Sequence, residues 1–424
     1  MSKGRDHLWT IGITAAATAA LTIIVRNFIS GEEKITHRIA QRYGISDPQF
    51  ERAMSQLLGP PILSGNAVKP LQNGREIFPA MLAAIAEAER SITFETFIYW
   101  EGEIADRFAD ALAAKARQGV KVHVLIDGVG CDCVNGEALR RMTRAGVELE
   151  LYHTANLART NERTHRKLLV IDGRLGFTGG VGIADNWDGD AEDPEHFRDT
   201  QYRVEGPVVA QMQAAFLDNW MKTRAVVLHG EDYFPELHEA GELRCQMFKS
   251  SPMEGSESAR LMYLLSIAAA EKNIKIGNAY FLPDDLTTQT LLEAVERGVS
   301  VEVLLPGRTI DSKSVRLAAR QRLGRLLEGG VKVYEFEPTM YHCKCMMIDD
   351  LWTSVGSANF DNRSFRINDE ANLNVIDEEF TRREVEVFSC DVARAGEFTY
   401  DDWQNRSLGE KLVGGTAALL RSQL

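Results

Sequence analysis

The sequence predicts an α/β protein made of two copies of one lobe, and three observations support this prediction. Amphipathic helical stretches alternate with short apolar strands, which is the pattern of a largely parallel sheet covered by helices. A helix–glycine–strand unit recurs, since ARQGVKVHVLI at 116–126 matches VERGVSVEVLL at 295–305. A chain of 424 residues with 44% hydrophobic content is also long enough to bury two cores.

The N-terminal segment, 1–30, contains an uncharged run from Leu8 to Val25 that lies between Arg5 and Arg26. As a helix, this run would extend about 27 Å, which is enough to cross the hydrocarbon core of a bilayer. A cleaved signal peptide would need a small-residue cleavage site after the run, and Val-Arg-Asn-Phe stands there instead. A buried helix is the other alternative. We predict a single-pass transmembrane anchor, with its orientation left open.

The elements of the two lobes follow one another in the same order. Helices are expected at 77–90, 104–118, 139–145, 259–271, 291–297 and 322–328. Strands are expected at 91–99, 120–126, 147–152, 273–281, 299–305 and 331–336. Glycines such as Gly119 and Gly298 end a helix just before a buried strand, as expected for this type of unit.

The domain boundaries follow from breaks in this pattern. A charged and mainly helical stalk or linker is predicted over 31–74, where Gly59, Pro60 and Pro61 interrupt the helix. The other predicted segments are the first lobe at 75–225, a connection at 226–258, the second lobe at 259–405 and an amphipathic tail at 406–424. We expect the tail to pack on the body, with membrane contact as the alternative.

The composition limits the partners and cofactors. The formal net charge is −13, whereas proteins that grip nucleic acid usually carry a basic patch, so no nucleic-acid partner is expected. The six cysteines show neither CxxC spacing nor a dense framework, which indicates neither a zinc site nor disulfides. Cys343 and Cys345 alternate with His342, so we expect them to pack on the opposite face of a strand. No metal is expected.

The second half contains the pattern His-x-Lys-x-x-x-x-Asp at His342, Lys344 and Asp349. On an extended strand His342 and Lys344 share one face, because side chains repeat every two residues. A lysine can neutralise a phosphate while an imidazole, with a pKa of about 6.5, attacks it or moves a proton. A Gly-Ser-x-Asn turn and a strand-like segment follow, which contain Gly356, Ser357, Asn359 and Glu370.

The first half repeats the pattern at His165, Lys167 and Asp172, followed by Gly179 and Gly180. The spacing from the motif aspartate to the first glycine is seven residues in both halves. One chance match is on the order of a few per cent for such a composition, and two at corresponding places in a repeat are far rarer. The pair indicates a phosphate site. We expect Asp172 and Asp349 to support the motif turns by hydrogen bonds rather than to touch the substrate.

The paired motifs and their glycine-containing followers resemble those of the phospholipase D superfamily. Within it, NAYFLPDD at 278–285, FRDTQYRVEGP at 197–207 and GSANFDNRSFRINDEANL at 356–373 look like bacterial cardiolipin synthases. The resemblance covers roughly 75–405. It implies two α/β lobes related by a pseudo-two-fold axis, with both motifs at one active site. It also implies phospholipid substrates, phosphatidylglycerol among them, and a place at the bacterial cytoplasmic membrane.

The resemblance further implies a two-step transfer through a phosphohistidine, with no cofactor. His165 is the expected nucleophile and His342 the general acid and base, although the symmetric motifs alone leave this assignment open. Lys167 and Lys344 would hold the nonbridging oxygens and stabilise charge in the transition state. Additional phosphate donors would come from Gly180, Ser357 and Asn359.

Each histidine needs a partner on its other ring nitrogen. Asp199 and Glu370 begin equivalent strand-like segments and match the orienting carboxylates of the family. We therefore expect Asp199 to serve His165 and Glu370 to serve His342. For either carboxylate alone, an ordinary place at a strand edge is the alternative.

The first motif departs from the family pattern at one position. Gly182 stands where the second motif has Asn359, so the first half of the phosphate site has no side-chain donor there. The amides of Gly180 and Gly182, or the side chain of Asn186, are the expected substitutes. This difference leaves the acceptor open but not the class of reaction.

Four functions are compatible with these residues to different degrees. The leading hypothesis is a membrane-anchored phosphatidyltransferase that makes cardiolipin from phosphatidylglycerol and a second phospholipid. A phospholipase D-type hydrolase would use the same residues with water as the acceptor, and the sequence does not separate the two. A nuclease is disfavoured by the net charge and the lipid-synthase-like flanks. A non-catalytic anchored scaffold is disfavoured by the intact histidines, lysines and carboxylates.

Overall fold

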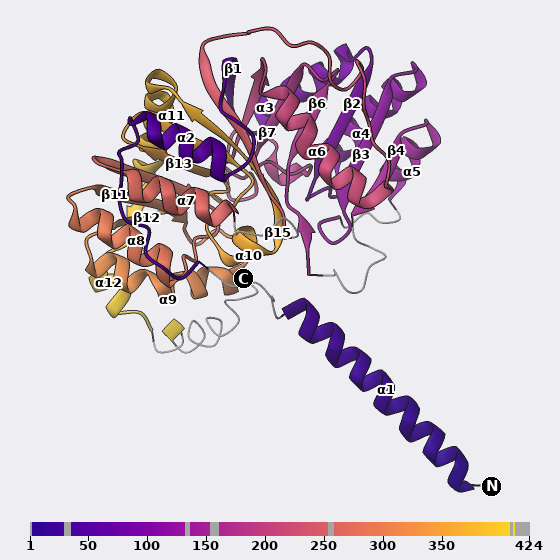
Figure 1. Ribbon diagram of the computed structural model, residues 1–424, viewed down its shortest axis with the longest axis horizontal. Coiled ribbons are helices and arrows are strands. Elements are labelled where there is room, and N and C mark those ends of the chain that lie inside the picture. Colours follow the sequence, from indigo (N-terminus) through magenta and orange to yellow (C-terminus); the bar gives the residue numbers. More distant parts are fainter. Residues whose placement is uncertain are drawn as a thin grey trace.

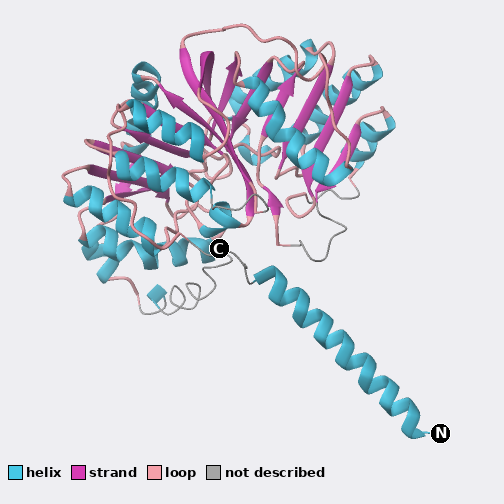
Figure 2. Ribbon diagram, in the orientation of Figure 1, coloured by secondary structure: helices cyan, strands magenta, loops and turns pink. Residues whose placement is uncertain are grey.

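The computed structural model describes residues 2–28, 35–131, 136–152, 161–252, 258–407 and 410–411, without the side chains of 2–8 and 23–28. In this part of the chain, one large mixed sheet of sixteen strands runs through the body and is covered by helices (Figure 1, Figure 2). Helix α1 (Ser2–Phe28) projects away from the body, and its described side chains, 9–22, are exposed.

The first half of the body contains the elements from α2 to α6. The helices are α2 Pro48–Leu57, α3 Asn73–Glu87, α4 Glu103–Arg117, α5 Glu137–Arg144 and α6 Val209–Arg224, with a 3₁₀ turn η2 at Asp185–Trp187. The strands are β1 Leu63–Gln72, β2 Ser91–Thr96, β3 Lys121–Asp127, β4 Glu148–Tyr152, β5 Arg163–Thr164, β6 Leu168–Ile171, β7 Leu175–Gly179 and β8 Thr200–Glu205.

The second half contains the elements from β9 to α12. The helices are α7 Ser258–Ala269, α8 Asp285–Glu296, α9 Lys313–Glu328, α10 Asn362–Arg366, α11 Glu378–Val392 and α12 Tyr400–Gln404. The strands are β9 Leu243–Ser250, β10 Asn273–Asn278, β11 Ser300–Pro306, β12 Lys332–Phe336, β13 Lys344–Ile348, β14 Trp352–Gly356, β15 Asn368–Ile376 and β16 Ala395–Glu397.

The strand order shows the internal repeat. Across the sheet the order is β16-β12-β11-β10-β13-β14-β15-β9-β1-β8-β7-β6-β2-β3-β4, and β5 pairs with β15 at the side. Strands β2, β3 and β4 are parallel, as are β10, β11 and β12, whereas the central strands from β13 to β6 are antiparallel. Reading outward from the β9–β1 pair gives the same succession in each lobe, apart from the edge strand β16.

Alternation along the buried strands places a core on each face of the sheet. In β3, Val122, Val124 and Ile126 join the first-lobe core under α3, α4 and α5, whereas Leu125 joins a second core with α6. This second core extends across the junction to Met247 of β9. Because side chains alternate between the faces, β3 contributes apolar side chains to both helical layers.

The predicted stalk differs from the structure. Within the described part of 31–74, Pro48–Leu57 is helical and α3 begins at Asn73, whereas β1 (Leu63–Gln72) pairs with β8 and β9 near the middle of the sheet. The charged pattern before Gly59 suggested a long helix, but Pro48 can occupy only the first turn and the helix begins there, capped by Asp47. Strand β9 likewise lies within the predicted connection at 226–258.

The prediction of an N-terminal transmembrane anchor is wrong. Across the described residues, no helix combines the length and the apolarity needed to span a membrane. The prediction rested on the absence of charge between Leu8 and Val25, but alanine and threonine, rather than large aliphatic side chains, make up half of this run. Most of the predicted amphipathic tail, 412–424, lies outside the described residues.

Candidate active site

The two histidine motifs come together where the lobes meet. His165 and Lys167 lie just before β6, and His342 lies two residues before Lys344, the first residue of β13. All four side chains are buried, and each histidine is 7% exposed. The charge of Lys344 acts on the pKa of His165, so the motifs are close enough to interact electrostatically. The two motifs therefore contribute to one composite site.

Backbone hydrogen bonds between the lobes position the histidines. The amide of His165 donates to the carbonyl of Asp369 (2.9 Å), where β5 runs parallel to the start of β15. In the other half, the amide of His342 donates to the carbonyl of Arg198 (2.8 Å). Each motif is thus joined to the residue immediately before the other lobe's carboxylate.

These bonds decide which carboxylate serves which histidine. His165 Nδ1 lies 3.0 Å from both oxygens of Glu370, and His342 Nδ1 lies 2.7 Å from Asp199 Oδ2. The predicted pairing of Asp199 with His165 and of Glu370 with His342 is therefore wrong, because it kept each pair within one lobe. Since an ionised carboxylate only accepts hydrogen bonds, Nδ1 carries the proton in both neutral imidazoles and Nε2 keeps its lone pair.

The motif lysines lie beside the histidines. Lys167 Nζ donates to the carbonyl of His165 (2.7 Å), and Lys344 Nζ donates to the carbonyl of His342 (2.5 Å). Lys344 Nζ also lies 3.2 Å from His342 Nε2, as expected for side chains on one face. An ammonium group has three donors, so each lysine can contact a phosphate oxygen and keep its carbonyl contact.

Burial sets the charge states of these groups. Burial lowers the pKa of His165 to about 4, although the Glu370 carboxylate acts in the opposite direction. It lowers the pKa of Lys167 to about 7, and burial together with the charge of Lys344 lowers the pKa of His342. For Glu370, burial acts to raise the pKa, but His165 and Lys167 outweigh it and the pKa is lowered. At neutral pH both imidazoles are neutral and Glu370 is ionised.

Glu370 is held by three further donors from its own lobe. Ser357 Oγ (2.5 Å) and Ser364 Oγ (2.7 Å) donate to its carboxylate, and Asn368 Nδ2 donates at 3.3 Å. We expected Ser357 to bind phosphate directly. Its one hydroxyl proton is instead directed at Glu370, so Ser357 acts on the site through Glu370 and His165.

A tryptophan takes the place of these hydroxyls in the other half. Trp187 Nε1 donates to Asp199 Oδ2 (3.0 Å), and the indole packs edge-on against the His342 ring with the centroids 5.1 Å apart. Trp187 and Ser364 both stand eight residues after the glycine that ends the motif strand, so they are equivalent in the repeat. Neither residue was predicted from the sequence, although their equal spacing from the motif glycines is a signal that the repeat contains.

Trp187 also explains why the first motif has no asparagine. A Cβ atom at Gly182 would lie 2.7 Å from the Cβ of Ile98 and 3.1 Å from the indole ring, so the space is already filled. At the equivalent position of the second motif, Asn359 is buried, and its side-chain oxygen has no hydrogen-bond partner within the described residues. This oxygen is an acceptor, so it gives no evidence for donation to a phosphate, and a role for Asn359 in phosphate binding stays a prediction.

The other expected substitutes in the first motif behave differently. A Cβ atom at Gly180 would collide with the carboxylate of Asp199, so glycine is required for that carboxylate to reach its histidine. Asn186 is half-buried, and its side chain donates to the carbonyl of Glu195 at 3.4 Å rather than to the motif. A role for the Gly180 amide in phosphate binding stays a prediction.

The motif aspartates, Asp172 and Asp349, each bind the backbone at the start of a neighbouring strand. Asp172 accepts three backbone N–H bonds at the start of β2, from Glu89, Arg90 and Ser91. Asp349 accepts the equivalent three at the start of β10, from Glu271, Lys272 and Asn273. Hydrogen bonding by these carboxylates agrees with the expectation, but the bonds reach the neighbouring strand rather than the motif turn itself.

A buried ion-pair network behind the site escaped the sequence analysis. Arg166 is fully buried, donates to Asp218 at 3.2 Å and lies 3.6 Å from Asp369. The hydroxyl of Tyr152 donates to Asp369 at 2.6 Å. Because Arg166 follows His165 and Asp369 precedes Glu370 in the chain, the network holds the backbone on both sides of this histidine–carboxylate pair.

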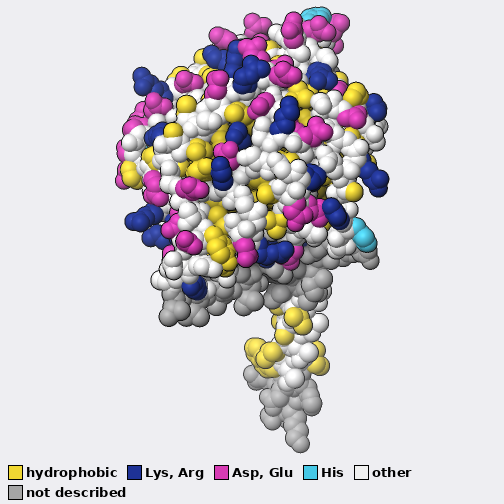
Figure 3. All heavy atoms as spheres, turned by 90° about the vertical axis from the view of Figure 1, so that its left-hand side faces the viewer, with side chains coloured by type: hydrophobic (Ala, Val, Ile, Leu, Met, Phe, Trp, Pro, Cys, Tyr) yellow, Lys and Arg dark blue, Asp and Glu magenta, His cyan; other side chains and the backbone are white. Residues whose placement is uncertain are grey.

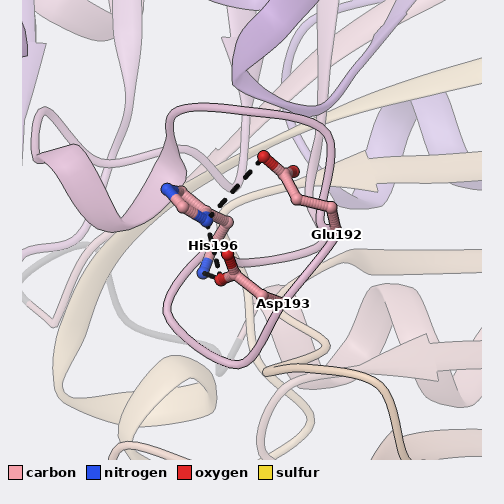
Figure 4. A group of neighbouring side chains, drawn as sticks. All are labelled: Glu192, Asp193 and His196. Carbon is pink, nitrogen blue, oxygen red and sulfur yellow. Dashed lines mark hydrogen bonds and ion pairs between the residues drawn. The ribbon is translucent and has the colours of Figure 1, made fainter.

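One group of side chains could supply metal ligands. Among the described residues, one cluster has potential ligand atoms close together, and it consists of Glu192, Asp193 and His196 (Figure 4). His196 Nδ1 lies 2.7 Å from Asp193 Oδ1, which also accepts from the amides of Glu195 and His196. These contacts satisfy that oxygen within the loop that leads to Asp199, so a structural role explains the group.

Cys343 packs with Tyr341 in an apolar cluster.

Comparisons with known proteins agree with this geometry. The family model described as "Cardiolipin synthase, PLD-like domain" matches residues 81–220 and 263–391, which contain both motifs and both carboxylates. Cardiolipin synthase A of Pseudomonas syringae pv. syringae (strain B728a) is 34% identical over 377 residues, 88% of this chain and 77% of that protein. Cardiolipin synthase of Staphylococcus aureus (strain Mu50) is 32% identical over 85% of this chain and 74% of that protein.

The fold has a counterpart among solved structures. The phosphatidylserine synthase of Haemophilus influenzae Rd KW20 superposes with a TM-score of 0.70 over 89% of this chain and 100% of that chain. The two sequences are 15% identical, so this likeness concerns the fold. With the family model covering most of both lobes, and with the curated relatives matching across the site, the chain belongs to the cardiolipin synthase family of phospholipase D-like proteins.

Proposed function

We propose that this protein is a phosphatidyltransferase that makes cardiolipin from phosphatidylglycerol and a second phospholipid, working at a membrane surface. The observation that supports this most is the pair of histidine–carboxylate contacts exchanged between the lobes. They give one site with two neutral imidazoles and two lysines. These groups can supply the nucleophile, the general acid and base, and the positive charge needed to displace an alcohol from a phosphodiester in two steps. The family supplies the class of substrate.

In the first step, His165 Nε2 attacks the phosphorus of the donor lipid. The N–P bond forms as the bond from phosphorus to the leaving glycerol oxygen breaks, and His342 Nε2 gives its proton to that oxygen. Glu370 holds His165 in the tautomer that leaves Nε2 free, and stabilises the positive charge that develops on the ring. The low pKa of His165 keeps this nitrogen unprotonated at neutral pH.

His342 must be protonated when this step begins. Burial, together with the positive charge of Lys344, lowers the pKa of His342 in the free enzyme. An anionic phosphodiester between Lys167 and Lys344 offsets that charge, so substrate binding raises the pKa of His342 while Asp199 steadies the imidazolium. His342 therefore gains the proton that it needs as general acid when the substrate binds.

In the second step, the acceptor alcohol attacks the phosphorus of phosphohistidine. His342, now neutral, takes the proton of the acceptor hydroxyl through Nε2, the O–P bond forms, and the N–P bond to His165 breaks. With phosphatidylglycerol as donor and acceptor, the products are cardiolipin and glycerol. Lys167 and Lys344 stabilise the negative charge on the nonbridging oxygens in both steps.

Product analysis tests this proposal. Purified protein is incubated with phosphatidylglycerol labelled in its headgroup glycerol and its acyl chains, and the lipid and water phases are separated. Labelled cardiolipin and free labelled glycerol in equal amounts are expected. Phosphatidic acid as the sole lipid product would contradict transfer and assign hydrolysis instead. A parallel incubation with single-stranded DNA should leave the strand intact, since acidic and basic side chains are intermixed on the face shown in Figure 3.

A further inference from the structure

A second cavity lies in the second lobe, away from the catalytic groups. Its volume is about 380 Å³, and it is lined by residues of α7, α8, α9 and α10 and by Ile35 and Thr36. The described lining includes none of the histidines, lysines or carboxylates of the catalytic site. A volume in the range of about 300–1,000 Å³ is typical of small-molecule pockets. The cavity is therefore large enough for a small ligand of its own.

Arginine dominates the lining of this cavity. The charged residues among the described lining are Arg260, Asp284, Asp285, Arg322, Arg325 and Arg366. Arg260 Nε pairs with Asp284 at 2.6 Å, and Arg322 pairs with Asp285 at 2.7 Å. Within the described lining, four guanidinium groups are thus found with two carboxylates, in a chain whose net charge is −13. An excess of positive charge that is concentrated in one cavity favours an anionic ligand.

The chemistry of arginine narrows the class of anion. The planar guanidinium group presents parallel N–H donors that match the oxygens of a phosphate. Arg260 is already held in place, because it is 4% exposed, donates to the carbonyl of Ile35 at 2.8 Å and forms an ion pair with Asp284. Arg325 is exposed and takes part in no ion pair within the described part of the chain, so it is available to a ligand.

Helix α10 connects the cavity to the catalytic site. Asn362 and Arg366 are four residues apart, so they share one side of the helix, and both line the cavity. Ser364 lies between them in the sequence and its hydroxyl donates to Glu370, the partner of His165, at 2.7 Å. A ligand that fixes α10 from the cavity would also fix the Ser364 hydroxyl on Glu370.

We propose that this cavity binds a phosphate ester, either as the headgroup of an anionic phospholipid or as a free phosphate compound, and that its occupancy supports catalysis through α10. Bare inorganic phosphate fills only part of the volume, so the ester is the preferred ligand. The site is additional to the donor and acceptor sites of the transfer reaction. The effect of cavity occupancy on the rate rests on the proposed function, whereas binding of the phosphate ester in the cavity does not.

Calorimetry on the full chain tests binding. The probes are glycerophosphoglycerol, inorganic phosphate, and phosphatidylcholine vesicles with and without phosphatidylglycerol. Two binding events are expected with glycerophosphoglycerol, one at the catalytic lysines and one in the cavity. Arg325→Gln should weaken the cavity event about tenfold or more, in line with the loss of a charged hydrogen bond, and Lys167→Gln should weaken only the other event. Arg107→Gln, an exposed arginine of α4, is the matched control and should change neither.

The outcomes separate the sources of the ligand. Saturation by glycerophosphoglycerol without any response to vesicles would assign a free phosphate ester, whereas tighter binding of phosphatidylglycerol vesicles would assign a lipid headgroup. Unchanged binding by Arg325→Gln and by an Arg322→Gln/Arg325→Gln double variant, both with wild-type unfolding midpoints, would overturn the site.

A rate measurement tests the effect on catalysis. With a soluble aryl phosphodiester as substrate, phosphatidylglycerol vesicles should raise kcat at least about fivefold, the lower end of typical coupling between sites. Arg325→Gln should keep the basal rate and lose this response, and Ser364→Ala should lose it as well. Cavity binding that leaves kcat unchanged would overturn the action through α10. If no diester is turned over in any condition, the proposed function fails while the binding result still stands.

Discussion

The exchanged pairs predict that Glu370 and Asp199 serve different roles, because Glu370 supports the nucleophile His165 and Asp199 supports proton transfer by His342. Glu370→Gln keeps the shape of the side chain but presents an amide to His165 Nδ1, which stabilises the wrong tautomer and no longer balances the imidazolium. Removing a carboxylate that orients a catalytic histidine lowers kcat by about 10³–10⁴-fold, or about 4–5.5 kcal/mol. Because Glu370 is bonded to His165 at 3.0 Å and to two serine hydroxyls, we expect the full loss. Asp199→Asn should affect proton transfer by His342 instead, by about 10²–10⁴-fold.

Leaving-group chemistry separates the two roles in one assay. An aryl phosphodiester releases a stable phenolate that needs no general acid, so its first step depends on His165 and Glu370 alone. We expect Asp199→Asn to keep the pre-steady-state burst of phenolate within about tenfold of wild type, and Glu370→Gln to lose it by about 10³-fold. Glu384→Gln is a matched control, because Glu384 is buried and bonded to Tyr202 rather than to a histidine. A burst that Asp199→Asn loses and Glu370→Gln keeps would refute the exchanged pairing.

Three further predictions concern the pH dependence and the supporting residues. In the free enzyme kcat/KM should fall below about pH 4, where His165 gains a proton. Its alkaline limb should begin below the ordinary histidine pKa of about 6.5, where His342 loses the proton that the first step needs, and should steepen above about pH 7, where Lys167 loses one. Lys167→Arg should remove only the second of these two ionisations from the pH–rate profile. Gly182→Asn should lower the free energy of unfolding by about 1–3 kcal/mol in denaturant titrations, because its Cβ has no space. Gly396→Ala is the control for this substitution, because a Cβ atom added at Gly396 would have no other atom within 4 Å. Asp349→Ala should lower that free energy by about 1–3 kcal/mol and leave kcat within about threefold, and a kcat loss of about 10³-fold would contradict its structural role.

The repeat was visible in the sequence because its signals are local. Helix, glycine and strand follow one another within about ten residues, and the motif residues have fixed spacing, so the two α/β halves and the histidines, lysines and aspartates could be found directly. The place of β1 could not, because its partners β8 and β9 lie far away in the sequence. The prediction of a transmembrane anchor failed for a different reason, because an absence of charge in the N-terminal run was equated with the ability to cross a membrane.

The pairing of carboxylates failed for a physical reason. In the sequence Glu370 follows His342 and Asp199 follows His165, and nothing local indicates that the strands exchange partners between lobes. The exchange depends on the hydrogen bonds from the His165 amide to Asp369 and from the His342 amide to Arg198, which exist only when both lobes are folded. The equivalence of Trp187 and Ser364, in contrast, was available from the repeat.

We infer one catalytic site to which both lobes contribute, with His165 as the nucleophile. The most direct measurement is to stop turnover of a labelled phosphodiester within milliseconds, digest the protein under alkaline conditions that preserve phosphohistidine, and locate the modified peptide by mass spectrometry. The label should be found on the peptide that contains His165, and His165→Asn should abolish it. A label on the His342 peptide in the wild-type protein would contradict the assignment, and rapid turnover with no labelled histidine would contradict the covalent mechanism.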